Sequence, residues 1–222
     1  MDKIALIEPS WGMDIINWGI DIQTKYEWIS NLAPIFADIF VLAYPIFLVS
    51  IYIYAIAKKE PQTKQWALYI FFVTLFWVLI NIWIQFFLYK ERPLEILGQV
   101  DTWETLLHEI LPVSSFPSDH AVVSMTFAMA TLLWWIYNRK KFFTWSGVFF
   151  IFVSIIMTAC RVLTLVHWPS DILAGLWLWI LVSLLFMVRP FRYMVLRICV
   201  NPLIRLEQWI MRKVFHYEQE KI

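Results

Sequence analysis

Two short stretches of the sequence each place a histidine beside the tripeptide Pro-Ser-Asp. His120 directly follows the first tripeptide, residues 117–119, and His167 comes two residues before the second, residues 169–171. An imidazole titrates near about pH 6.5, so at neutral pH it can accept a proton, donate one or attack an electrophile. Asp171 follows His167 by four residues, a spacing that lets its carboxylate hold one ring nitrogen and leave the other free. The two stretches therefore predict nucleophilic and acid–base catalysis.

Both tripeptides are also a common beginning for a helix. Proline suits the first turn, and an oxygen of Ser118 or Asp119 can accept from backbone N–H groups that have no partner within the helix. The same N–H groups, together with the positive end of the helix dipole, attract anions. Capping explains the Pro, Ser and Asp residues but leaves His120 without a role. We therefore interpret the first stretch as a helix start that also takes part in chemistry.

Two arginines accompany the histidines. Arg161 precedes His167 by six residues, and Arg92 stands before Pro93 at the end of an apolar run. A guanidinium presents a fixed fork of donors that suits an anion with several oxygens. Gln85 lies seven residues before Arg92, about two helical turns, so both side chains can point the same way. A polar stripe on an apolar helix indicates a face turned toward protein or water.

The composition of the chain places these residues in a membrane protein. Of the 222 residues, 61% are hydrophobic and 16% are charged, and the mean hydropathy is +0.66. A soluble globular domain carries about 25% charged residues. The net charge of +1 gives no argument for nucleic acid as a partner, and the two cysteines form neither a disulfide framework nor a metal-binding motif. We therefore predict an all-α integral membrane helical bundle with membrane lipids around it.

Five stretches are long and apolar enough to cross a bilayer, which takes about 20 residues. They are Ile35–Ala57, Trp66–Tyr89, Ala121–Tyr137, Phe142–Ala159 and Ile172–Val188. Residues 13–22 are predicted as a short N-terminal helix in the membrane interface, with a sixth span as the alternative. The segment that begins at Arg189 alternates arginines with apolar residues, which predicts a basic amphipathic helix. We expect one membrane domain over residues 1–190 and an amphipathic cytoplasmic tail over residues 191–222.

The positions of the lysines and arginines predict the orientation of the bundle. Basic residues gather in the connections after the first and third predicted spans, residues 58–64 and 139–141, and again in the tail. By the positive-inside rule these regions face the cytoplasm. Both Pro-Ser-Asp stretches then lie on the extracytoplasmic side. The acidic connection over residues 90–119 lies there too, and its residues 101–111 are predicted to form a short amphipathic helix.

Three motifs together resemble the type-2 phosphatidic acid phosphatase superfamily, which also contains vanadium haloperoxidases. The family signatures are Lys-x6-Arg-Pro, Pro-Ser-Gly-His and Ser-Arg-x5-His-x3-Asp. In the same order, this chain has Gln85-x6-Arg92-Pro93, Pro117-Ser118-Asp119-His120 and Cys160-Arg161-x5-His167-x3-Asp171. The resemblance covers roughly residues 35–190, and it implies a membrane phosphatase that acts on lipid phosphates.

The resemblance also implies a role for each motif residue. His167 is the expected nucleophile, Asp171 orients its ring, and His120 is the proton donor. Arg92, Arg161 and Ser118 are expected to bind the phosphate. No metal or other cofactor is expected, because no cluster in the sequence has the ligand spacing of a zinc site.

Three positions depart from the family pattern. Gln85 stands where the family has lysine, and Lys90, two residues before Arg92, is a candidate to replace that charge at the phosphate. Asp119 stands in place of glycine, a variant that resembles the branch acting on undecaprenyl diphosphate. Cys160 stands in place of serine. We therefore expect undecaprenyl diphosphate as substrate, with phosphatidylglycerol phosphate, phosphatidic acid and lipid A phosphates as alternatives. Outside the enzyme class, the alternatives are a catalytically silent membrane scaffold or transporter and a haem-binding carrier that uses the two histidines.

Overall fold

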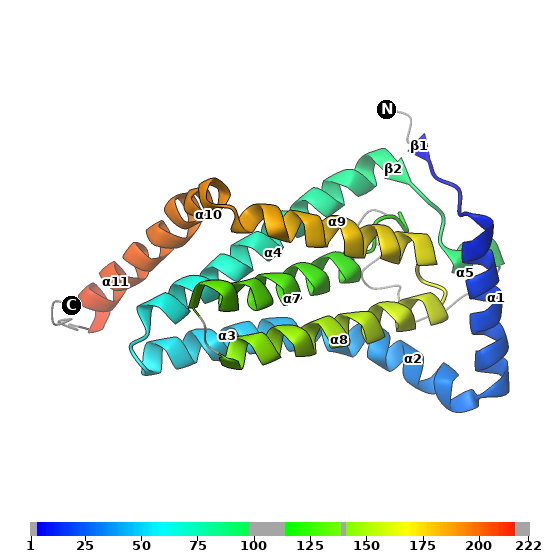
Figure 1. Ribbon diagram of the computed structural model, residues 1–222, viewed down its shortest axis with the longest axis horizontal. Helices are drawn as coiled ribbons and strands as arrows, with labels where there is room; N and C mark the ends of the chain where they lie inside the picture. The colour runs from blue at the N-terminus through cyan, green and yellow to red at the C-terminus, as the bar shows by residue number, and fades with distance from the viewer. Residues whose placement is uncertain (1–3, 98–113, 139–140, 216–222) are drawn as a thin grey trace.

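The long helices of the chain lie side by side along one axis, and a shorter helix crosses one end of the bundle (Figure 1). The computed structural model describes residues 4–97, 114–138 and 141–215. In order, the elements are β1 (Ile4–Ala5), α1 (Ser10–Lys25), α2 (Glu27–Ile39), η1 (Phe40–Leu42), α3 (Ala43–Ala57), α4 (Pro61–Phe87), β2 (Leu88–Tyr89), α5 (Pro93–Leu97), α7 (Asp119–Asn138), α8 (Lys141–Leu163), α9 (Pro169–Met187), α10 (Arg189–Val195), η3 (Leu196–Val200) and α11 (Asn201–Phe215). The predicted helical class is confirmed, with two strands of two residues each as the addition.

Four helical stretches in the described part of the chain are long and apolar enough to cross a membrane. They are Glu27–Ala57, Pro61–Phe87, Thr144–Leu163 and Pro169–Met187. These stretches contain most or all of the first, second, fourth and fifth predicted spans. The first stretch begins eight residues before the predicted Ile35, because Pro34 lies inside α2 without ending it.

The third predicted span forms α7, whose 20 residues would reach about 30 Å along the helix axis. This helix packs against α4, α8 and α9. Its hydroxyl side chains at Ser124, Thr126 and Thr131 are buried against protein. Where α8 crosses α7, a Cβ atom at Gly147 would lie 2.7 Å from the Leu132 backbone, so this close approach requires glycine.

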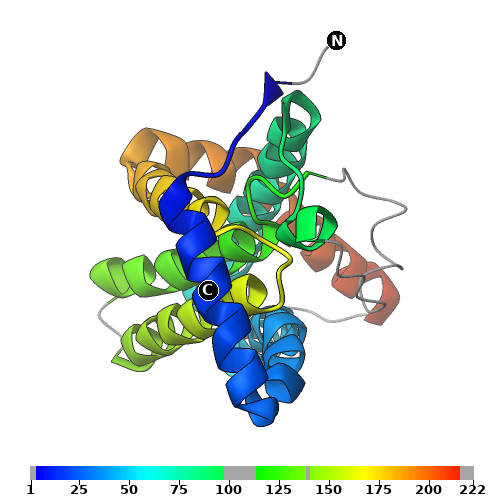
Figure 2. The same ribbon diagram turned by 90° about the vertical axis from the view of Figure 1, so that its right-hand side faces the viewer.

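The N-terminal segment covers the end of the bundle at which α8 leads into α9 (Figures 1 and 2). The predicted short helix is confirmed as a helix, but it is longer and runs over Ser10–Lys25. Its Ile16 packs into a buried cluster with Leu165 and Trp168. Ahead of α1, the strand β1 pairs in parallel with β2 at the end of α4. The interfacial position of α1 stays a prediction.

The C-terminal segment extends from the opposite end of the bundle (Figure 1). It is helical over Arg189–Phe215, as predicted, but a π-helical turn over Leu196–Val200 separates α10 from α11. Glu207 ties α11 to the α3–α4 region, where it lies 2.5 Å from the Lys64 ammonium and accepts from the Tyr52 hydroxyl at 2.8 Å. The helix predicted for residues 101–111 lies outside the described residues.

Candidate active site

The candidate residues gather at the end of the bundle that α1 crosses. Gln85 lies in the last turn of α4, and Lys90 and Arg92 follow β2. Ser118, Asp119 and His120 begin α7, whereas Arg161 lies near the end of α8 and Asp171 in the first turn of α9. His167 occupies the connection between α8 and α9. Two connections of the bundle, from α4 to α7 and from α8 to α9, therefore supply one site together with the helix ends that flank them.

A tight turn places His167 in the protein interior. Leu165 adopts a left-handed backbone with φ of 60°, which is unusual for a bulky residue. Burial of Leu165 and Trp168 against Ile16 holds this turn, and the Leu94 N–H donates to the Leu165 carbonyl at 3.0 Å. His167 itself is 2% exposed.

The carbonyl oxygen of Ser115 selects the tautomer of His167. The distance from His167 Nδ1 to this oxygen is 2.8 Å, and a carbonyl can only accept, so Nδ1 carries the proton. The Nε2 atom then has a free lone pair. Burial lowers the pKa of His167 well below its ordinary range, and the guanidinium groups of Arg161 and Arg92 lower it further. A neutral imidazole with Nε2 unprotonated is the form that can attack phosphorus.

The predicted contact between Asp171 and the His167 ring is not formed. The Asp171 Oδ2 atom lies 4.0 Å from His167 Nδ1, beyond hydrogen-bond distance. Oδ2 instead accepts from the Trp168 backbone N–H at 3.0 Å and from the Ser115 hydroxyl. The cause is local: Asp171 is the third residue of α9, where a carboxylate folds back onto the residue that caps the helix. Asp171 therefore reaches the ring through Ser115.

Lys90 contacts Asp171 and two other oxygen-bearing side chains. Its ammonium is 4% exposed and donates to Asp171 Oδ1 at 2.8 Å, Ser170 Oγ at 2.6 Å and Glu8 Oε2 at 2.5 Å. An ammonium has three donors, and these partners occupy all of them. Two carboxylates, those of Glu8 and Asp171, hold the Lys90 ammonium in this geometry. The replacement of the missing lysine by Lys90 at the phosphate stays a prediction.

His120 and Arg161 lie in contact. Arg161 Nη1 lies 3.3 Å from His120 Nε2. Arg161 Nη1 also donates to Asp38 Oδ1 at 2.7 Å. Since a guanidinium only donates, His120 Nε2 is the acceptor. Asp38 belongs to α2, is 56% exposed and was missed in the sequence. The signal that could have found it is an acidic residue inside the first apolar span, where charge is costly and usually functional.

Gln85 positions the loop before α7. Its amide nitrogen donates to the Pro117 carbonyl at 2.9 Å and to Asp119 Oδ1 at 3.2 Å. Asn81, one turn earlier in α4, donates to the same two oxygens at 3.2 Å and 2.5 Å. The two departures from the family pattern, Gln85 and Asp119, therefore contact each other.

Ser118 and Arg92 complete the surroundings of the two histidines. The Ser118 hydroxyl is buried and has no hydrogen-bond partner among the described residues, so it is available to an oxygen of a bound anion. Arg92 is buried and its Nη1 donates to the Val166 carbonyl at 3.4 Å, which places the guanidinium beside the turn that carries His167.

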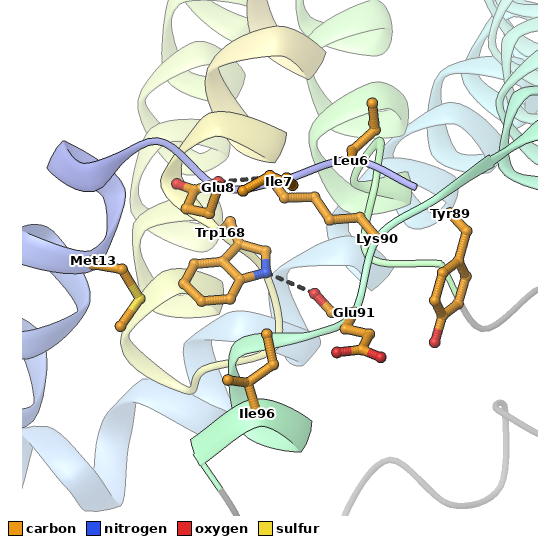
Figure 3. A pocket seen from close by; sticks show the side chains of 9 residues that line it. All are labelled: Leu6, Ile7, Glu8, Met13, Tyr89, Lys90, Glu91, Ile96 and Trp168. Atoms are coloured by element: carbon orange, nitrogen blue, oxygen red, sulfur yellow. Dashed lines mark hydrogen bonds and ion pairs between the residues drawn. The ribbon is translucent and has the colours of Figure 1, made fainter. Parts of the chain in front are cut away.

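A separate hollow of about 410 Å³ lies beside Trp168 (Figure 3). Its lining consists of Leu6, Ile7, Glu8, Met13, Tyr89, Lys90, Glu91, Ile96 and Trp168. Neither histidine and neither arginine of the site lines it. The indole N–H of Trp168 donates to the Glu91 carbonyl at 2.6 Å across its edge. The candidate nucleophile His167 is therefore not among the residues that line this hollow.

The histidines, arginines and helix start described above fall within a stretch that matches a known family model. Residues 65–194, more than half of the chain, match the model of the PAP2 superfamily, and the chain belongs to this superfamily. Over 62 residues it is 44% identical to the protein named "Putative undecaprenyl-diphosphatase YbjG" of Escherichia coli (strain K12). That match covers 28% of this chain and 28% of the relative's length. No solved structure matches this chain.

Proposed function

We propose that this chain is a membrane lipid phosphatase that removes the terminal phosphate from an isoprenoid or glycerolipid (di)phosphate. The observation that carries the proposal is the state of His167: buried, neutral, with Nδ1 donating to the Ser115 carbonyl and Nε2 unprotonated. Membership of the PAP2 superfamily supports a phosphatase.

In the proposed reaction, His167 Nε2 attacks the terminal phosphorus of the substrate. A bond forms between nitrogen and phosphorus while the bond from phosphorus to the leaving oxygen breaks, which gives a phosphohistidine. His120 donates a proton to the leaving oxygen and then takes one from water as that water attacks the phosphohistidine. The new bond from oxygen to phosphorus replaces the bond from Nε2 to phosphorus, which releases inorganic phosphate and restores the neutral ring of His167. His120 accepts from Arg161 in the structure. The negative charge of a bound phosphate beside it favours the protonated ring that the first step requires.

The proposed phosphate ligands are the two arginines, Ser118 and the start of α7. Arg92 and Arg161 both lie close enough to His167 to lower its pKa, and each guanidinium can donate to phosphoryl oxygens. The Ser118 hydroxyl and the N–H groups that begin α7 add neutral donors. These groups stabilise the charge that develops on phosphorus-bound oxygens during attack.

The proposed substrate is undecaprenyl diphosphate, hydrolysed on the extracytoplasmic face of a bacterial plasma membrane. Three arguments support this choice: the Ser118-Asp119-His120 variant, the name of the partial relative, and the basic residues near the opposite end of the bundle. The proposal includes α7 as a fifth span. The long tail of such a lipid would lie along the apolar exterior of the helices while its phosphates meet His167 at the end of the bundle.

A phosphate-release assay on the detergent-solubilised protein tests this function. The substrates are undecaprenyl diphosphate, phosphatidylglycerol phosphate, phosphatidic acid and lipid A, each with and without EDTA. We expect release from undecaprenyl diphosphate to be fastest and unchanged by EDTA. Absence of release from all four lipids would overturn the proposed function, and faster release from another lipid would overturn the proposed substrate.

A further inference from the structure

The N-terminal segment of the chain is attached to the backbone that carries Lys90. Ile4 and Ala5 pair with Leu88 and Tyr89 in parallel register, and the Leu6 N–H donates to the Tyr89 carbonyl at 2.9 Å. This attachment brings Glu8 next to Lys90, which is 82 residues away in the sequence. The segment lies outside residues 65–194, the stretch shared with the superfamily. Its contribution is therefore not part of the family motifs.

The side chain of Glu8 is buried in a space that the chain keeps open for its carboxylate. Its side chain is 5% exposed, and Oε2 lies 2.5 Å from the Lys90 ammonium (Figure 3). The Ser170 hydroxyl donates to the same oxygen. A Cβ atom at Gly12 would overlap the Glu8 carboxylate, so the glycine makes room for it. A buried carboxylate is costly unless it is paired and hydrogen-bonded. The Oε2 atom of Glu8 has both kinds of partner, whereas Oε1 is buried with no hydrogen-bond partner among the described residues.

A continuous series of contacts leads from Glu8 to His167. Lys90 shares its ammonium between Glu8 and Asp171 Oδ1, which lies 2.8 Å from it. The other Asp171 oxygen accepts from the Ser115 hydroxyl, and the Ser115 carbonyl accepts from His167 Nδ1 at 2.8 Å. The Lys90 carbonyl also accepts from the Ser115 N–H at 2.8 Å. Lys90 therefore contacts Ser115 both through its backbone and through Asp171.

We propose that Glu8 is a positioning residue for His167 and acts through Lys90, Asp171 and Ser115. The inference rests on the proposed function, in which His167 is the nucleophile. Without the Glu8 carboxylate, the buried ammonium keeps Ser170 as an acceptor and has Asp171 as its remaining carboxylate partner. Asp171 is then drawn away from the Ser115 hydroxyl, and the carbonyl that holds the His167 ring loses its support. The attack of Nε2 slows, whereas the phosphate ligands Arg92 and Arg161 stay in place.

The test compares Glu8→Gln, which keeps the shape and removes the charge, with Asp14→Asn as the matched control. Asp14 is an exposed acid on α1. We expect Glu8→Gln to lower kcat for the lipid substrate by about tenfold, the size of effect that outer partners of a functional histidine have in metal sites. The KM and the inhibition constant of inorganic phosphate stay unchanged. Glu8→Asp, which keeps the charge, retains more activity than Glu8→Gln, and Asp14→Asn matches the wild type.

A second readout separates positioning from a merely structural role. The charged groups near His167 are Arg161, Arg92 and His120, with Asp171 and Lys90 behind Ser115. Glu8 adds a negative charge next to Lys90. Its removal disfavours the protonated His167 ring, so the acid limb of the pH profile of kcat moves to lower pH in Glu8→Gln. Loss of folded protein alone would scale kcat at every pH and leave the limb in place. If both kcat and the acid limb of its pH profile are unchanged in Glu8→Gln, the proposal is overturned.

Two further measurements test the proposal if Glu8→Gln does not fold or if the wild type releases no phosphate. If Glu8→Gln does not fold, Gly12→Ala takes its place, because the new Cβ atom displaces the Glu8 carboxylate without removing its charge. We expect the same loss of kcat in Gly12→Ala. A wild-type kcat in that variant would overturn the proposal. If the wild type releases no phosphate from any lipid, the proposed function fails. The Glu8 inference is then decided by nitrogen-15 imidazole NMR, in which Glu8→Gln shifts the His167 titration and Asp14→Asn does not. An unshifted His167 titration would overturn it.

Discussion

The His167 ring donates from Nδ1 to the carbonyl oxygen of Ser115 at 2.8 Å. This single bond decides which ring nitrogen carries the proton and therefore which nitrogen can act as a nucleophile. In many catalytic sites a carboxylate performs this task directly. Here the Asp171 carboxylate does not touch the His167 ring. It accepts a hydrogen bond from the Ser115 hydroxyl instead, so that Ser115 stands between the carboxylate and the ring.

Because Asp171 supports the ring indirectly, we predict a graded response to its replacement. Asp171→Asn keeps an oxygen that can accept from Ser115 or Trp168 but removes the charge that pairs with Lys90. Asp171→Ala removes both. We expect kcat to fall by about tenfold for Asn and by up to about 100-fold for Ala, with KM little changed. Steady-state kinetics on the lipid diphosphate check this order, and full activity of Asp171→Ala would contradict it.

The lowered pKa of His167 predicts a loss of stability in acid. In the unfolded chain this histidine takes up a proton as the pH falls below about 6.5, whereas the buried ring does not. The unfolded state then binds more protons, so the free energy of unfolding decreases as the pH falls. His167→Gln removes this contribution and should flatten the decrease. Denaturant titrations in detergent from pH 7.5 down to 5 measure the free energy of unfolding of the wild type and of His167→Gln. An equal dependence on pH in the two proteins would contradict the prediction.

Asp38 is predicted to weaken anion binding at the resting site. Its carboxylate accepts from Arg161 at 2.7 Å, so it competes with a phosphate for that guanidinium. Since Asp38 is more than half exposed, solvent screens the pair. We expect Asp38→Asn to strengthen inhibition by inorganic phosphate roughly two- to fivefold, the range expected of exposed ion pairs. Asp21→Asn, an exposed acid on α1, serves as the control. Weaker inhibition in Asp38→Asn would show that Asp38 positions Arg161 instead.

Gln85 and Asp119 are predicted to be coupled, because they contact each other where the superfamily pattern has lysine and glycine. In Gln85→Lys the new ammonium pairs with the Asp119 carboxylate, and the binding of inorganic phosphate changes little. In the double variant with Asp119→Gly the ammonium is released toward the phosphate. We expect the effects to depart from additivity by about 1 kcal/mol or more, roughly fivefold in the inhibition constant. Independent effects of the two substitutions would contradict this coupling.

The sequence predicted the long helices well because their apolar runs match the thickness of a bilayer. It also predicted that Arg92, His120, Arg161 and His167 lie near one another, since their positions follow from the ends of those helices. The contacts that support the candidate nucleophile His167 could not be predicted. A backbone carbonyl such as that of Ser115 has no signature in the sequence. Glu8, a partner of Lys90, lies in an N-terminal segment that the β1–β2 pairing brings near. Asp38 was overlooked because a single acid did not end the apolar run around it.

The central claim is that His167 is the nucleophile of a lipid phosphatase, and phosphate release by His167→Ala tests it most directly. The wild type and the variant are compared in detergent on undecaprenyl diphosphate at equal amounts of monodisperse protein. The account predicts rapid release by the wild type and none above the uncatalysed rate by His167→Ala. Release by the variant at the wild-type rate would contradict it.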